Sequence, residues 1–344
     1  MTSFSVTIVM PAYNAAQHLP KVVPAALAAL KGGRLIVVDP GSNDETANLA
    51  ESLGAEVVRL GHRGGPAIAR NRGVELVDTP LCLFIDSDCV AHENVVEKVR
   101  AAFEANPELV SIMGSYDDSP PEQNFFSQYM NLRHHHTHQH GNVEGESFWA
   151  GCGAVSTEVF RRVGGFDAEQ FPMPMIEDVE LAFRLKPHGK MRLDPTLQVT
   201  HLKRWSLRGV VTTDIFSRAV PWSRLILNTG ELPNDLNLAW LQRLAAAVAP
   251  LTLLAPLAIP TTLAFGYFGI AAVFGAAVFI SCWVHRGMFG FFWRRRGPAF
   301  AIGALLFHQV HLIYSAATLV VLTLERLLKG RPASKTVVSK SARS

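Results

Sequence analysis

The chain has 344 residues, a formal net charge of +3 and 49% hydrophobic content, which is high for a purely soluble protein. Its charge is unevenly divided, because residues 1–243 hold 22 Lys and Arg against 28 Asp and Glu, whereas residues 244–344 hold 10 against 1. The acidic front part argues against nucleic-acid binding, and the basic tail suits anionic lipid head groups or the ordinary flanks of membrane helices.

The front part alternates short β-rich runs with segments of helical periodicity. The expected strands are residues 4–10, 34–39, 55–60 and 81–86, and the expected helices are residues 15–30, 44–54 and 65–77. This alternation predicts an α/β fold whose mixed, mainly parallel sheet is covered by helices on both faces. Ligands bind beyond the carboxyl ends of such strands. We therefore expect Asn14, Asp39 and Asp86 to converge on one crevice.

The stretch "LFIDSD", residues 83–88, places two aspartates at the end of a buried strand. Carboxylates in such a position are costly unless they are paired, hydrogen-bonded or bound to a metal. Asp86 and Asp88 therefore predict a cation, although aspartates also cap turns.

The back part predicts membrane attachment. No charged residue occurs from Leu244 to Val284 or from Gly297 to Leu324, which leaves room for two spans and one span respectively. The N-terminus lacks a signal peptide pattern, and four cysteines without CxxC spacing indicate reduced thiols in the cytosol. We expect a multi-pass protein of the cell inner membrane with a cytoplasmic catalytic domain. Three full spans would put the basic tail outside, against the positive-inside rule, so one stretch is re-entrant or the rule fails.

Six blocks occur in the order that is typical of family 2 glycosyltransferases: "VMPAYNAAQHL", "VVDPGSNDET", "AIARNRGVE", "LFIDSD", "FWAGCGAVSTEVFRRVGGFD" and "IEDVELAFRL". The chain resembles this family over about residues 4–205, in its membrane-attached form. The resemblance implies a GT-A (Rossmann-like) fold that binds a nucleotide sugar as donor.

The resemblance also implies roles for individual residues on the donor side. The residues expected to bind the donor are Pro11, Tyr13, Asn14, Asp39, Arg70 and Asp86. A divalent ion, Mg²⁺ or Mn²⁺, is expected on Asp88, Asp86 and His201, where a histidine favours tolerance of manganese. Pro40 stands where the family commonly has a second aspartate, so the base of the nucleotide stays open. Arg70 is expected on the first turn of a helix, facing phosphate or nucleoside, or else as a surface arginine in an ion pair, and His201 could instead be a core histidine.

Asp178 is expected to be the general base of an inverting transfer, with Glu177 as its supporting neighbour, because both match the family's ED motif at a helix start. N-terminal capping is the alternative for these carboxylates. The residues expected to line the acceptor pocket are Trp149, Gly151, Cys152, Gly153, Lys203, Arg204 and Trp205. Trp149 could instead be a buried structural tryptophan.

The histidine-rich tract "HHHTHQH", residues 134–140, resembles a mobile loop that contacts phosphates in membrane-attached family members, and a structural zinc site is the alternative. The expected organisation is a catalytic domain over residues 1–210, an interfacial linker over 211–243, a membrane domain over 244–324 and a flexible basic tail over 325–344. The expected function is transfer of one sugar to a membrane lipid or lipid-linked acceptor. A polyprenyl-phosphate sugar synthase and an inactive membrane scaffold are the alternatives.

Overall fold

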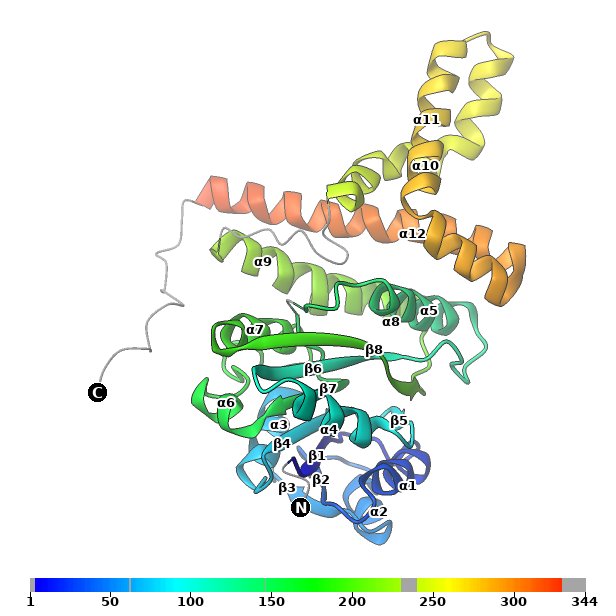
Figure 1. Ribbon diagram of the computed structural model, residues 1–344. Helices are drawn as coiled ribbons and strands as arrows, with labels where there is room; N and C mark the ends of the chain where they lie inside the picture. The colour runs from blue at the N-terminus through cyan, green and yellow to red at the C-terminus, as the bar shows by residue number, and fades with distance from the viewer. Residues whose placement is uncertain (1–3, 62, 146, 230–239, 330–344) are drawn as a thin grey trace. The chain divides into compact units, whose positions relative to one another are not determined.

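The computed structural model describes residues 4–61, 63–145, 147–229 and 240–329 (Figure 1). The chain forms two compact units, of which unit 1 is Met1–Val210 and unit 2 is Val211–Ser344. Positions 330–344, most of the expected basic tail, lie outside the described residues.

Unit 1 is built on an eight-stranded sheet with the order β3-β2-β1-β4-β7-β6-β8-β5. The first four strands in this order are parallel to one another, whereas β7 is antiparallel to both β4 and β6, and β5 is antiparallel to β8. The strands are β1 Val6–Pro11, β2 Leu35–Asp39, β3 Glu56–Arg59, β4 Leu81–Ile85, β5 Cys89–Ala91, β6 Leu109–Tyr116, β7 Cys152–Ser156 and β8 Lys190–His201. The predicted mixed, mainly parallel sheet is confirmed.

Helices cover both faces of this sheet. The helices of unit 1 are α1 Leu19–Leu30, α2 Thr46–Ser52, α3 Pro66–Glu75, α4 Val95–Ala105, α5 Phe125–Gln139, α6 Thr157–Arg162 and α7 Glu177–Leu185, followed by a 3-10 turn, Lys186–His188.

Two apolar cores result from the alternation of side chains along the strands. On β1, Ile8 and Met10 pack in a core with α1 and α4, whereas Val9 packs in the opposite core with α3, α6 and α7. On the second face α3 lies very close to the sheet, since a Cβ at Gly73 would stand 2.4 Å from the Val9 side chain. The sheet is thus buried on both faces. A ligand can therefore reach it at the carboxyl ends of its parallel strands.

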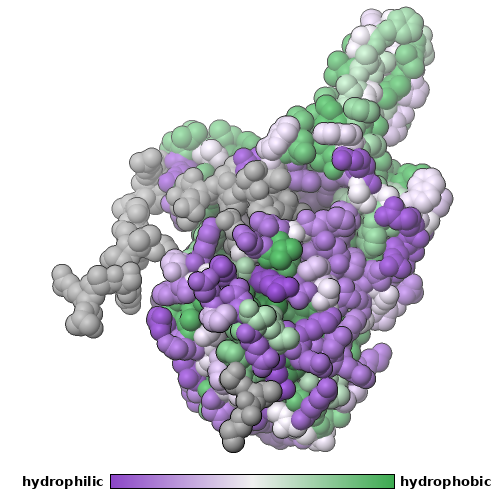
Figure 2. Space-filling view, in the orientation of Figure 1, coloured by the Kyte–Doolittle hydropathy of each residue, from purple (hydrophilic) through white to green (hydrophobic). Residues whose placement is uncertain are grey.

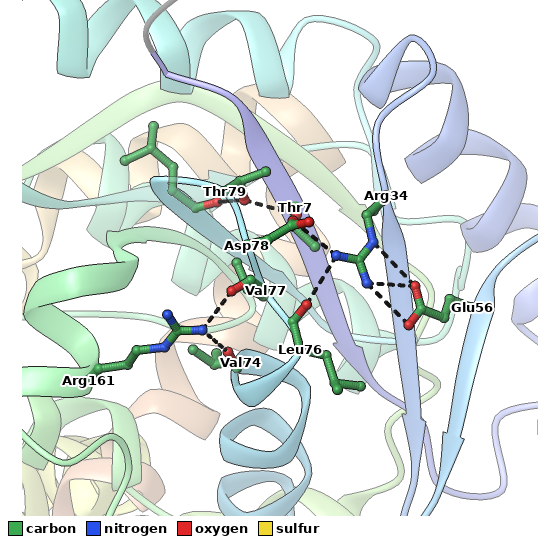
Figure 3. Close-up of polar contacts among 10 residues, drawn as sticks. Thr7, Arg34, Glu56, Val74, Leu76, Val77, Asp78, Thr79 and Arg161 are labelled. Carbon is green, nitrogen blue, oxygen red and sulfur yellow. Dashed lines mark hydrogen bonds and ion pairs between the residues drawn. The ribbon is translucent and has the colours of Figure 1, made fainter.

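The opposite edge of the sheet is held by a polar network (Figure 3). Arg34, before β2, donates to Glu56 of β3 at 2.8 Å and to Asp78 before β4 at 3.0 Å. Arg161 of α6 donates to the carbonyl oxygens of Val74 and Val77 at the end of α3, at 2.9 and 2.6 Å. These contacts join the segments that precede the strands and leave the carboxyl ends free.

Unit 2 consists of helices. α8, Leu207–Thr212, crosses the boundary between the units, and a π-helical segment, Thr213–Ala219, then leads into α9, Val220–Thr229. Next come α10 Trp240–Ala264, α11 Phe268–Val284 and α12 Arg286–Lys329. α10 and α12 are long and apolar enough to cross a membrane, whereas α11 has 17 residues.

α10 and α11 lie side by side as a hairpin that turns at Gly266, which has φ of +77° (Figure 1). The surface of this hairpin is largely hydrophobic (Figure 2) and includes Leu257 and Phe268, exposed by 77% and 70%. α12 is kinked at Gly297, and beyond the kink it runs across the direction of the hairpin rather than along it (Figure 1). Because apolar side chains of this size are seldom left in water, the hairpin is the part of unit 2 best suited to lipid.

Candidate active site

The loops that follow β1 and β2 are joined at the carboxyl edge of the sheet. Asn14 has a φ of +49°, a conformation that asparagine tolerates better than most residues. Its backbone N–H donates to Ser42 Oγ at 2.9 Å, and its side-chain oxygen accepts from the Asn43 N–H at 2.9 Å. Ser42 in turn donates to Asp39 through both its backbone N–H and its hydroxyl, at 2.8 and 2.7 Å. Asn14 and Asp39 are therefore linked through Ser42 at the carboxyl edge of the sheet.

A cavity of about 270 Å³ opens beside Asp39. Its lining residues are Asp39, Gly41, Ser42, Asp44, Ala47, Asn48, Arg59 and Gly61. The other expected donor residues of the β1 loop, Pro11 and Tyr13, do not line it, and Tyr13 is exposed beneath the guanidinium of Arg63 at 5.5 Å. Arg59, which the sequence analysis did not select, brings a cation to the wall of this cavity.

Arg70 lies deeper than the sequence predicts. It is the fifth residue of α3 rather than a residue of its first turn, and it is 4% exposed, so it is not a surface arginine. Its guanidinium donates to Asp86 Oδ1 at 2.7 Å and to Glu177 Oε1 at 2.9 Å. A planar guanidinium with several donors suits such a bridge. Arg70 thus connects the end of β4 with the start of α7.

Strand register brings Asp88 to His201. Cys89 of β5 is paired with His201 of β8, so the residue before Cys89 lies beside the end of β8. The Asp88 carboxylate is 3.6 Å from His201 Nε2, too long for a good hydrogen bond. The His201 ring stacks on Tyr116 at a centroid distance of 4.2 Å and an angle of 10°. His201 is therefore held in place at 6% exposure, next to the carboxylate with which it was predicted to act.

The two aspartates differ in their electrostatics. Burial raises the pKa of Asp86, Arg70 opposes this rise, and the nearby charge of Asp88 adds to it. Burial would also raise the pKa of Asp88, but His201, Lys203 and His18 outweigh it and hold that pKa below its usual range. Asp88 is thus the carboxylate that stays ionised most firmly, which is the state that a metal ligand needs.

Glu177 and Asp178 begin α7 and point to different partners. Glu177 is 4% exposed and accepts from the Met175 N–H at 2.9 Å as well as from Arg70. Asp178 accepts from the Val179 N–H at 2.9 Å and from the Ala150 N–H at 3.3 Å. Backbone donors therefore fix Asp178 beside the segment that was expected to line the acceptor pocket.

The environment of Asp178 weakens its acidity. Burial and the neighbouring charge of Glu177 raise its pKa to about 7, although Arg70 and the two backbone N–H donors oppose the rise. A carboxylate with such a pKa can take a proton at physiological pH and later release it, as a general base must.

The expected acceptor segment packs tightly upon itself. A Cβ at Gly151 would stand 2.3 Å from the Trp149 ring, and one at Gly153 would stand 2.4 Å from the Trp149 carbonyl oxygen. The two glycines are thus needed for packing around Trp149, whose partly exposed ring lies 4.7 Å from Tyr116. Cys152 is fully buried and burial raises its pKa to about 12. Its thiol faces the core, so only Trp149 of this segment offers a side chain to a ligand.

The three residues after His201 do not act as one group. Lys203 Nζ lies 4.2 Å from the centroid of the Trp205 ring, and Trp205 is 7% exposed. The backbone N–H of Trp205 donates to Ser127 Oγ of α5 at 2.7 Å. Arg204 points outward to Glu122 at 3.7 Å. Of the three, Lys203 is the one whose charge lowers the pKa of Asp88.

Comparison with known proteins shows to which family the sequence of unit 1 is similar. The model of the family "Glycosyl transferase family 2" matches residues 7–164. A pre-mycofactocin glycosyltransferase of Mycobacterium tuberculosis is 31% identical over 224 residues, which cover 61% of this chain and 45% of that protein. Residues 7–164, just under half of the chain, are thus similar to glycosyltransferase family 2. The mixed, mainly parallel sheet of unit 1 agrees with the α/β fold that the sequence blocks imply.

Two further proteins are similar to this chain at lower identity. The validoxylamine A glucosyltransferase of Streptomyces hygroscopicus is 28% identical over 229 residues, covering 53% of this chain and 51% of that protein. A solved mannosyltransferase of Pyrobaculum calidifontis, in complex with GDP-Man and Mn²⁺, is 14% identical, with a TM-score of 0.48 over 92% of this chain and 87% of that one. This chain thus spans about half the length of the curated relatives named here.

The histidine-rich tract of unit 1 is helical. Residues 134–139 form the last turns of α5, so the predicted loop is wrong. Contacts to the sheet fix this end of α5. His135 Nδ1 is hydrogen-bonded to the carbonyl oxygen of Tyr116 in β6 at 2.8 Å, and Gln139 donates to the carbonyl oxygen of Pro195 in β8 at 2.8 Å. His138 is 7% exposed, and burial lowers its pKa to about 4. Its neutral ring lies 5.2 Å from the Trp149 ring.

Besides Arg59, two further residues of the site escaped the sequence analysis. Tyr116 contacts both His201 and Trp149, and His18, directly before α1, is close enough to Asp88 for each to shift the pKa of the other. The only signal for Tyr116 was its place at the end of a strand, and His18 lay within an expected helix. Neither signal singles out a functional residue.

Proposed function

We propose that the chain is an inverting, metal-dependent glycosyltransferase that moves one sugar from a nucleotide-sugar donor to a membrane lipid or lipid-linked acceptor. The observation that carries this proposal is the Arg70 bridge between Asp86 and Glu177. It links the donor-side carboxylate Asp86 to Glu177, the neighbour of the expected base, which supports a single crevice for both halves of a transfer reaction.

The donor-side residues fit a divalent ion. Asp88 and His201 present an oxygen and a nitrogen 3.6 Å apart, and Mg²⁺ or Mn²⁺ commonly accepts one or two protein ligands when phosphates and water supply the rest. Among the residues that the structure describes, no three His, Cys, Asp or Glu side chains are arranged to hold a metal by themselves. Asp86, whose Oδ1 is engaged by Arg70, has a second oxygen for the ion or the donor. The bound ion would neutralise the diphosphate as it leaves.

The acceptor side fits a general base. Inverting transfer requires a proton to leave the acceptor hydroxyl on the side opposite the diphosphate. Asp178 is the carboxylate of the crevice whose raised pKa suits this role. Trp149, anchored by Tyr116 and His138, supplies an aromatic face for a sugar or lipid head group.

Unit 2 provides the reason for a lipid acceptor. Apart from Arg243 in its first turn, the α10–α11 hairpin carries no Lys, Arg, Asp or Glu and suits insertion into a bilayer. α12 is apolar enough to span as well, but we assign its part beyond Gly297 to the membrane surface because it crosses the hairpin direction. A hairpin enters and leaves on the same side. We therefore propose that the proposed catalytic unit and the basic tail both lie on the cytosolic side of a cell inner membrane, a topology that the positive-inside rule supports.

Product analysis tests the proposal. The purified chain is incubated with membrane lipid extract, Mn²⁺ and radiolabelled UDP-glucose or GDP-mannose, and the lipid fraction is separated by thin-layer chromatography. A labelled lipid that requires Mn²⁺ supports the proposal, and an anomeric configuration opposite to that of the donor supports inversion. A phosphodiester product would instead indicate a polyprenyl-phosphate sugar synthase. If the chain neither transfers a sugar nor hydrolyses any nucleotide sugar, it is an inactive scaffold.

A further inference from the structure

Tyr116, the last residue of β6, has a backbone that is held by several contacts. It pairs with Val199 of the neighbouring strand β8. Its carbonyl oxygen accepts from Ser115 Oγ at 2.8 Å and is hydrogen-bonded to His135 Nδ1 of α5 at 2.8 Å. None of these contacts uses the Tyr116 ring, so a substitution of the side chain leaves all of them in place.

The Tyr116 ring, in contrast, contacts rings from three other parts of unit 1. It stacks face to face on His201 of β8, with centroids 4.2 Å apart and planes at 10°. It meets Trp149, before β7, edge to face at 4.7 Å and 81°, and His134 of α5 at 5.9 Å and 75°. Tyr116 therefore lies where an expected metal ligand and an expected acceptor residue come together.

The orientation of His201 depends on this stack. Its Nε2 is 3.6 Å from the Asp88 carboxylate, too far for a good hydrogen bond. Within the chain segments that the structure describes, no further hydrogen bond holds the His201 ring. A histidine that binds a metal is commonly oriented by a hydrogen bond to its second ring nitrogen. Here the parallel ring of Tyr116 takes that function, because rotation of the imidazole would break the stack.

The orientation of Trp149 depends on the same ring. Gly151 packs closely against the indole, since a Cβ at this position would stand 2.3 Å from it. Tyr116 and His138 contact the indole at 4.7 and 5.2 Å. Loss of the Tyr116 ring would leave a cavity beside a partly exposed side chain, and side chains next to a cavity relax into it. Trp149 would then no longer have one fixed position.

Simple core packing is the alternative for Tyr116, which is 8% exposed and borders the apolar core formed with α1 and α4. Core packing alone does not account for its partners. The rings around Tyr116 belong to a tryptophan and two histidines, and the parallel stack is with the histidine beside Asp88. The contacts thus connect the donor side with the acceptor side.

We propose that Tyr116 is a positioning residue, whose ring fixes His201 for the divalent ion and Trp149 for the acceptor at the same time. The inference rests on the proposed metal-dependent transfer and adds to it a residue that acts through two others. Loss of the ring should therefore alter both sides of the site.

Binding of Mn²⁺ alone to the full chain in a nonionic detergent tests the donor side. The free ion is followed by electron paramagnetic resonance, and Asp88→Asn gives the background of ions bound elsewhere. Tyr116→Leu should weaken Mn²⁺ binding about tenfold, a loss typical of residues that orient metal ligands and within reach of one aromatic pair. Tyr116→Phe keeps the ring and should bind Mn²⁺ as the unaltered chain does.

Phe103→Leu is the matched control. Phe103 is a buried aromatic residue of the same apolar core, but its ring packs on Phe4, before β1, at 6.3 Å. This variant loses a comparable ring at the opposite end of the sheet. Its Mn²⁺ affinity should be unchanged, which separates loss of positioning from general loss of stability.

Quenching of tryptophan fluorescence by acrylamide tests the acceptor side. The emission of Trp149 is obtained as the difference between each chain and the same chain with Trp149→Phe. Tyr116→Leu should make Trp149 more accessible to acrylamide, whereas Tyr116→Phe and Phe103→Leu should not. This measurement requires no donor, acceptor or catalysis.

The outcomes separate this inference from the proposed function. Equal Mn²⁺ affinity of Tyr116→Leu and the unaltered chain, an equal loss in Tyr116→Phe, or unchanged quenching of Trp149 would overturn the shared positioning role and leave the proposed transfer intact. An unaltered chain that binds no Mn²⁺ would overturn the metal site and the inference together. If Tyr116→Leu does not fold, as circular dichroism would show, Tyr116→Met, with a longer side chain, replaces it in both measurements.

Discussion

The imidazole of His201 lies 3.6 Å from the carboxylate of Asp88, at the end of two strands whose pairing places them there. A metal ion between them would relieve the charge of Asp88 and bring the diphosphate of the donor to the same point. This geometry leads to the first of five predictions.

Asp88→Asn should abolish the binding of nucleoside diphosphate that depends on Mn²⁺. The amide keeps the size of the carboxylate but removes the charge that holds the ion. Isothermal titration with UDP and GDP, with Mn²⁺ and with EDTA, measures the effect. Asp78→Asn is the matched control, since Asp78 is an exposed partner of Arg34 at the opposite edge of the sheet. Equal affinity of the Asp88 variant and the unaltered chain would exclude Asp88 as a metal ligand.

Asp178→Asn should reduce transfer by a factor of about 10² to 10⁴, the usual contribution of a general base, while donor affinity stays unchanged. The amide retains the hydrogen bonds from Ala150 and Val179 only in part but deletes the basicity. Initial rates of transfer and donor titrations measure the two quantities separately. Loss of donor binding would place Asp178 in the metal site, and an unchanged rate would make Glu177 the next candidate.

The pKa of Asp178, raised to about 7, predicts how transfer depends on pH. A base acts only when it is ionised, so kcat/KM should fall as the pH decreases below about 7, tenfold for each pH unit at the acid end. The same shift affects stability. Because the folded state binds the proton more tightly than the unfolded chain, stability is lost as pH rises from about 4 to about 7.

Asp178→Asn should therefore unfold at a higher temperature than the unaltered chain at pH 8, and the difference should vanish near pH 4. Thermal unfolding at the two pH values measures this change without any substrate. A stability difference of the same size at both pH values would mean that the pKa of Asp178 is not raised in the folded state.

Local patterns in the sequence were sufficient to predict the four parallel strands β1 to β4, because β-rich runs and helical spacing recur in the first 86 residues, but they did not predict β5 to β8. They failed at residues 134–140, where successive histidines have no amphipathic period, and where contacts to Tyr116 and Pro195 decide the structure. The environment of Arg70 was equally hidden. Its partner Glu177 lies 107 positions away, and a pairing over that distance exists only in the folded chain.

Arg70→Met should destabilise the folded chain strongly. Removing the guanidinium leaves Glu177 buried without its cation, and breaking a buried ion pair typically costs about 3–5 kcal/mol. Arg72→Met is the control in the same helix, because Arg72 forms an exposed pair with Glu75, a type of contact that contributes about 0–1 kcal/mol. Urea unfolding followed by circular dichroism gives both values. Similar losses for the two variants would contradict the bridging role assigned to Arg70.

A reporter fused after Ser344 should appear on the cytosolic side of the membrane. The proposed hairpin returns the chain to the side where it entered, and the residues after Leu324 include six Lys and Arg, namely Arg326, Lys329, Arg331, Lys335, Lys340 and Arg343. Basic segments are retained on the cytosolic side. Paired fusions of alkaline phosphatase and green fluorescent protein distinguish the two sides, and the same pair fused before Met1 provides the reference for the glycosyltransferase unit. Phosphatase activity after Ser344 together with fluorescence before Met1 would mean that α12 crosses the bilayer as a third span and that α10 and α11 are not the only segments inserted.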